Sequence, residues 1–90
     1  MASGHVWRIE IKGSCRKKIE RAPEHIQAAV DDALADISAD PFHHTHIKPL
    51  LGRKNYYRYR IGSYRLIYLV DKVRIVVVAV DFSPRGDAYK

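Results

Sequence analysis

The chain has 90 residues and a formal net charge of +6, and 47% of its residues are hydrophobic. This length suits one small domain over residues 1–90. No apolar run approaches the roughly 20 residues of a membrane span, and the N-terminal segment lacks a signal-peptide core. Its single cysteine, Cys15, excludes an internal disulfide, and we expect it to be a buried helix residue. We therefore expect a cytoplasmic protein with no membrane partner.

Positive charge concentrates in the second half of the chain. Residues 1–40 carry six basic and seven acidic side chains, whereas residues 41–90 carry ten basic and three acidic ones. No acidic residue occurs between Pro41 and Val70. A localised positive field is typical of a surface that binds a polyanion. A basic surface that serves only general solubility is the alternative.

The first forty residues predict a strand and two helices. Apolar and polar residues alternate from His5 to Lys12, which is the pattern of a half-buried strand. Ser14 is a suitable N-cap for a short basic helix that runs to about Arg21. Pro23 begins a second helix, in which apolar residues recur at spacings of three and four until Asp40-Pro41 ends it. We expect the two helices to pack together on one face of a sheet.

The segment from Phe42 to Lys54 has no periodicity. Pro49 and Gly52 mark it as a loop of about a dozen residues, and loops of this length are commonly functional. The histidines of HHTH at residues 43–46 suggest a metal site, but they lack cysteine partners and the spacing of a helical zinc motif. Solvated histidines are the preferred interpretation. We expect no metal and no other cofactor.

The segment NYYRYRIGSYRLIYLV, residues 55–70, is the most informative part of the sequence. Period-two alternation places Arg58 and Arg60 on one face of a strand and Tyr57 and Tyr59 on the other. One face is therefore expected to bind charge and the other to pack.

A hairpin is predicted to follow this arginine strand. Gly62-Ser63 suits a tight type II′ turn, because glycine supplies the positive φ at its first central position. Tyr64 to Val70 then forms the returning strand, which brings Arg65 within reach of Arg60.

The C-terminal part predicts a second turn at Asp71-Lys72 and a central strand over residues 73–82, which are apolar on both faces. The predicted fold is α+β. It has a mostly antiparallel four-stranded sheet with the N-terminal helical hairpin on one face, in the order β-α-α-β-β-β. The expected core includes Trp7, Ile9, Ile11, Ile26, Val30, Leu34, Ile37, Ile67, Val76 and Val78.

Basic and phenolic side chains form the candidate site. Guanidinium groups bind phosphate bidentately and aromatic rings stack on bases, so the combination favours RNA or single-stranded DNA. RNA brings its own nucleophile, the 2′-hydroxyl, and the protein need only align it, stabilise charge and assist proton movement. The expected catalytic residues are Arg58, Arg60, Arg65, Arg85 and Tyr89, and the expected RNA-binding residues are Lys48, Arg53, Lys54, Tyr56 and Lys90. Ordinary surface arginines are the alternative.

The chain resembles the RelE/ParE superfamily of toxins from toxin–antitoxin pairs, and specifically its RelE side. The resemblance rests on the WRIEI strand, a helical hairpin ending in ADP, a KPLLG loop, the YRYRIGSYRLIYLV hairpin and the tail PRGDAYK. It implies a RelE-like toxin that cleaves messenger RNA in the ribosomal A site by 2′-hydroxyl attack, leaving a 2′,3′-cyclic phosphate, without a metal. The implied partners are a RelB-like antitoxin, the ribosome and messenger RNA, with no small-molecule cofactor.

The family's site residues carry over by position, with two departures. The strand bases fall on Arg58 and Arg60, the hairpin arginine on Arg65, and the C-terminal pair on Arg85 and Tyr89. Some relatives have lysines at the two strand positions, and the well-studied bacterial form has a further arginine near Ser83. A ParE-like inhibitor of DNA gyrase without nuclease activity, or a catalytically degenerate RNA-binding homologue, remains an alternative.

Overall fold

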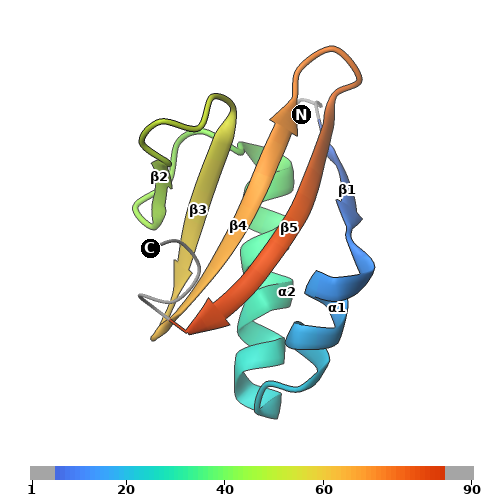
Figure 1. Cartoon of the computed structure of the whole chain (residues 1–90), viewed down its shortest axis with the longest axis vertical. Coiled ribbons are helices and arrows are strands. Elements are labelled where there is room, and N and C mark those ends of the chain that lie inside the picture. Colours follow the sequence, from blue (N-terminus) through green and yellow to red (C-terminus); the bar gives the residue numbers. More distant parts are fainter. Residues whose placement is uncertain (1–5, 85–90) are drawn as a thin grey trace.

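Two helices cover one face of a five-stranded sheet in the computed structural model, which describes residues 6–84 (Figure 1). In chain order the elements are β1 (Arg8–Ile11), α1 (Gly13–Glu20), α2 (Glu24–Ala39), β2 (Ile47–Pro49), β3 (Tyr56–Ile61), β4 (Tyr64–Asp71) and β5 (Val76–Pro84). Across the sheet the order is β1-β5-β4-β3-β2, and only the β1–β5 pair is parallel. The predicted α+β class and the helical hairpin on one face are confirmed.

The predicted count of four strands is wrong, because part of the expected loop pairs as β2. Ile47, Lys48 and Pro49 lie opposite residues 57–59 of β3, at the edge of the sheet. Three residues are too few to show a period in the sequence. An edge position also tolerates proline, which cannot donate to a strand on its outer side.

Both helices begin at positions other than those predicted. Lys12, not Ser14, is the N-cap of α1, and no side chain caps that terminus. Pro23 lies one residue before α2 as its N-cap, and its carbonyl accepts hydrogen bonds from the backbone N–H of Ile26 and Gln27. Cys15 is fully buried, as expected, and burial raises the pKa of its thiol to about 11. Neither helix in the described range is both long and apolar enough to cross a membrane.

The β3–β4 hairpin follows the prediction. Ile61 pairs with Tyr64, which leaves a two-residue turn, and Gly62 has a φ of 56°. Ser63 does not share this positive φ, which is the combination that a type II′ turn requires.

The β4–β5 turn is longer than predicted. Its four residues, 72–75, are held by the carboxylate of Asp71, which accepts hydrogen bonds from the backbone N–H of Val73 at 3.1 Å and of Arg74 at 3.0 Å. Ile75 completes the turn with a φ of 56°. Strand β5 therefore begins at Val76 rather than at Val73, because local side-chain hydrogen bonds compete with strand pairing.

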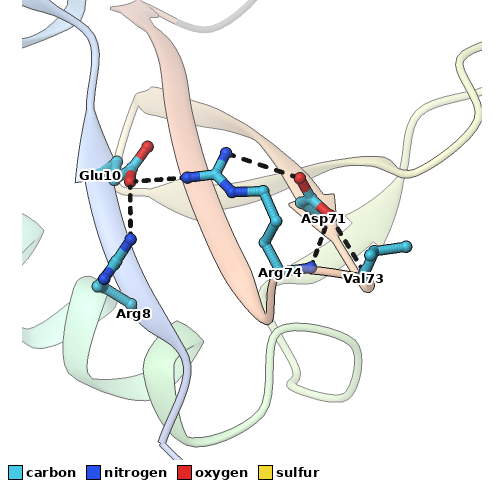
Figure 2. Close-up of polar contacts among 5 residues, drawn as sticks. All are labelled: Arg8, Glu10, Asp71, Val73 and Arg74. Atoms are coloured by element: carbon cyan, nitrogen blue, oxygen red, sulfur yellow. Dashed lines mark hydrogen bonds and ion pairs between the residues drawn. The ribbon is translucent and has the colours of Figure 1, made fainter.

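Arg74 also links this turn to β1 (Figure 2). Its guanidinium lies 3.3 Å from Glu10 Oε2 and 3.8 Å from Asp71 Oδ2, and Glu10 Oε2 is 3.5 Å from Arg8. The two arginines are exposed and the two carboxylates are half-buried at the surface, so each ion pair adds little stability. Together they connect the first strand to the turn that precedes the strand beside it.

The core lies between the sheet and the helices and is more aromatic than predicted. Of the expected core residues, Val30 and Ile37 are buried in this core, whereas Ile67 and Val76 are buried outside it. The half-buried ones are Trp7, Ile9, Ile11, Ile26, Leu34 and Val78. Phe82 and Tyr68 are buried on the helix side, and the Tyr68 hydroxyl donates to the carbonyl of Pro41 at 2.7 Å.

The buried tyrosines predict a loss of stability at high pH. Burial raises the pKa of both Tyr59 and Tyr68 above the ordinary value. Their stabilising effect is therefore complete below about pH 10, where tyrosine in the unfolded chain stays neutral, and is lost as the pH rises further. The slope expected for Tyr68 is up to about 1.4 kcal/mol per pH unit. Urea unfolding between pH 8 and 11 measures it, and Tyr68→Phe should flatten the slope, whereas a pH-independent free energy of unfolding would contradict the assignment.

Candidate nucleic-acid interface

The arginines of the β3–β4 hairpin lie on the sheet face opposite to the helices. The hydroxyl of Tyr59 donates to Asp36 on α2 at 2.7 Å, so this side chain marks the helix side of β3. Because side chains alternate along a strand, Arg58 and Arg60 face the other way. Arg65 lies directly opposite Arg60 in the antiparallel register and so shares its face. The predicted division of β3 into a charged face and a packing face is confirmed.

A hollow of about 780 Å³ lies on this arginine face, beside β2. Its described lining residues are Lys48, Pro49, Leu50, Leu51, Arg53, Arg58 and Arg65. Four of them are cationic and none is acidic. Leu51, which no sequence pattern marks as a site residue, is 96% exposed at this hollow. The wall therefore combines donors for phosphate with apolar surface for a base or ribose.

Like charges are held close together on the arginine face. Burial, and then the positive charges of Arg60 and Arg65, lower the pKa of Arg58. Its Nη1 donates to the carbonyl of His46 at 2.9 Å. Arg65 Nε is buried and has no hydrogen-bond partner among residues 6–84. An anion in the hollow would supply the negative charge that these guanidiniums lack.

Arg60 lies beside the hollow rather than in it. It is exposed and lines a smaller depression of about 170 Å³ with Thr45, His46, Lys48 and Arg58. His46, interpreted from the sequence as a solvated loop residue, has its carbonyl bonded to the backbone N–H of Arg60 at 3.0 Å. This contact of His46 could not be predicted from the sequence, because β2, which begins at the next residue, was not predicted.

The expected RNA-binding residues differ in where the structure places them. Lys48 and Arg53 line the hollow, whereas Lys54 is exposed outside it. Tyr56 is half-buried under the guanidinium of Arg53, which lies 4.4 Å from the ring centroid, a cation–π distance. Lys90 lies outside the described part of the chain, as do two of the expected catalytic residues, Arg85 and Tyr89.

Ser83 occupies the position at which the resemblance leads one to expect a further arginine. It pairs with Arg65 across β4 and β5, so its side chain lies beside Arg65 on the same face. Its Oγ is buried without a hydrogen-bond partner in the described range. The same range contains no group of three His, Cys, Asp or Glu side chains placed to hold a metal.

Comparison with known proteins places this geometry in a family. Residues 9–86 match the family model of the ParE toxin of the type II toxin–antitoxin system, parDE. The chain superposes on the archaeal RelE–RelB complex from Pyrococcus horikoshii OT3 with a TM-score of 0.80 at 24% identity, covering 92% of this chain and 99% of that one. It superposes on the toxin–antitoxin complex RelBE2 from Mycobacterium tuberculosis with a TM-score of 0.75 at 29% identity, covering 89% of this chain and 99% of that one.

A protein described as YoeB/ParE toxin, from Agrobacterium tumefaciens, is a further structural relative. It matches with a TM-score of 0.76 at 18% identity, covering 87% of this chain and 98% of that one. No curated protein sequence matches the chain. The expected likeness to RelE and ParE toxins is confirmed, whereas the roles of individual site residues remain predictions.

Proposed function

This chain belongs to the ParE toxin family of type II toxin–antitoxin systems, within the RelE/ParE superfamily, and from that premise we propose that it is a ribosome-dependent endoribonuclease. The observation that carries the proposal is the convergence of Arg58 and Arg65 on one hollow with Lys48 and Arg53, and with no acid among its described lining residues. Such a wall suits a phosphate flanked by nucleosides, as in a single RNA strand.

In the proposed reaction the 2′-hydroxyl of messenger RNA attacks the adjacent phosphate and expels the 5′-oxygen of the next nucleotide. Arg65 and Arg85 hold the phosphate and stabilise the charge that grows in the transition state. Arg58 and Arg60 position the strand and polarise the hydroxyl, and Tyr89 stacks on a base or assists proton transfer. The remaining contacts to RNA are assigned to Lys48, Arg53, Lys54, Tyr56 and Lys90. No metal or other cofactor takes part.

The proposed partner that silences this activity is an antitoxin, as the complexes named above contain one. A segment that is acidic and amphipathic would complement the arginine face, because it offers carboxylates to the guanidiniums and apolar anchors to Leu50 and Leu51. Such a segment would compete with RNA for the same hollow.

A second candidate is a ParE-like inhibitor of DNA gyrase that is not a nuclease, and the family model that matches the chain favours it. The decisive experiment is expression of the toxin alone, followed by mapping of RNA ends and of DNA breaks. The proposal predicts messenger RNA ends that carry 2′,3′-cyclic phosphates. Gyrase-linked DNA breaks without such ends would support the second candidate, and growth arrest with neither product would indicate a degenerate RNA-binding homologue.

A further inference from the structure

A continuous set of contacts joins helix α2 to the guanidinium of Arg58. It starts at Asp36 on α2, whose Oδ2 accepts the hydrogen bond from the Tyr59 hydroxyl and lies 3.4 Å from His44 Nε2. His44 belongs to the segment between α2 and β2, outside both elements. The carboxylate of Asp36 therefore lies between the hydroxyl of Tyr59 and the ring of His44 on the helix side of the sheet.

The second half of this set runs from His44 to the arginine face. His44 Nδ1 accepts a hydrogen bond from the backbone N–H of His46 at 3.1 Å, so the neutral ring carries its proton on Nε2, the atom nearest Asp36. The carbonyl of His46 in turn accepts from Arg58 Nη1 at 2.9 Å and from the backbone N–H of Arg60 at 3.0 Å. His46 thus links the helix side of the sheet to the arginine face at the sheet's edge.

Ring packing limits the freedom of His44 further. Its ring centroid lies 5.2 Å from that of Tyr59 and 5.4 Å from that of His46, in tilted arrangements. The neighbouring His43 differs, since its side chain is 83% exposed and its Nδ1 pairs with Asp40. Only one of the two adjacent histidines is therefore built into the contact set.

We propose that Asp36 and His44 are positioning residues that hold the His46 carbonyl in place and so aim Arg58 into the hollow. A long arginine side chain with one nitrogen anchored to a fixed acceptor loses less rotational freedom when its other nitrogens bind phosphate. This role rests on the proposed function, in which Arg58 contacts the RNA.

Four substitutions separate this role from simple loop stability. His44→Ala removes the contacts of both ring nitrogens, with the His46 N–H and with Asp36. His44→Asn can keep the acceptor for the His46 N–H, and His44→Gln can keep the donor toward Asp36. His43→Ala is the matched control in the same loop. Thermal unfolding of all four variants shows whether any loss reflects unfolding.

The first readout needs no RNA. In ¹⁵N-labelled protein, the side-chain N–H signals of Arg58, identified by their loss in Arg58→Lys, report on its hydrogen bond to His46. They should shift and exchange faster with water in His44→Ala, take intermediate values in His44→Asn and His44→Gln, and stay unchanged in His43→Ala. Unchanged signals in a folded His44→Ala protein would overturn the inference.

The second readout is single-turnover cleavage on programmed ribosomes. His44→Ala should slow cleavage by up to about 100-fold, the cost of a misplaced reacting group. Combined with Arg58→Lys it should cause no further loss, because both changes then act through one side chain. An equal loss in the two backgrounds would overturn the inference. If the wild type does not cleave at all, the proposed function fails, and the Arg58 signals alone decide whether His44 positions that side chain.

Discussion

Replacing Arg65 by alanine is expected to lower the single-turnover rate of messenger RNA cleavage by about 100- to 1000-fold, the usual cost of losing one transition-state cation. The Nε of Arg65 is buried without a hydrogen-bond partner in the described range, and the residue lines the hollow together with Arg58. Its removal should therefore spare the fold and much of the ribosome binding.

The matched control for this change is Arg74→Ala. Arg74 lies in the turn between β4 and β5, where it pairs with Glu10 of β1 (Figure 2). Arg65 lies near the opposite end of β4. Its loss should leave the cleavage rate within about threefold of wild type. A similarly small effect for Arg65→Ala, in a protein shown to be folded, would remove Arg65 from the mechanism. Arg85→Ala is expected to match Arg65→Ala.

The largest expected loss of stability follows from Phe82→Ala. Phe82 is 1% exposed, and its ring is stacked on Tyr64 with centroids 4.9 Å apart. Truncation of a buried phenylalanine costs about 3–5 kcal/mol. A chain of this size has a total stability of only about 4–13 kcal/mol, so the variant should be marginally folded.

Urea unfolding followed by circular dichroism measures this loss. Val73→Ala serves as the control, because Val73 is 92% exposed in the β4–β5 turn and its truncation should change the free energy of unfolding by less than about 0.5 kcal/mol. A cost below about 1 kcal/mol for Phe82→Ala would mean that the aromatic stack does not contribute to the core as its burial indicates.

The fold was largely predictable because its long elements carry strong periods. Helix α2 shows spacings of three and four over sixteen residues, and β3 alternates arginine with tyrosine, so both were found with the correct faces. The elements that were missed depend on pairing or on side-chain hydrogen bonds. Strand β2 exists because β3 offers a free edge, and the 72–75 turn exists because Asp71 captures two backbone N–H groups.

The candidate site was predictable only in part, for a related reason. Alternation puts Arg58 and Arg60 on one face, and the two-residue turn adds Arg65, but neither says which loop lies beside that face. The part played by His46 depends on the register of β2, and the position of Ser83 beside Arg65 depends on an irregularity in the β4–β5 ladder after residue 67. Neither leaves a local pattern in the sequence.

The parallel pairing of β1 with β5 also bears on how this toxin is made. Residues 8–11 are synthesised early, but their pairing partners, residues 76–79, are synthesised 68 residues later in a chain of 90. Until then β1 has no neighbour in the sheet, since it lies at the edge and pairs with β5 alone. Contacts so distant in sequence form late in folding. A nascent chain therefore cannot complete its five-stranded sheet until residues 76–79 are available to pair with β1.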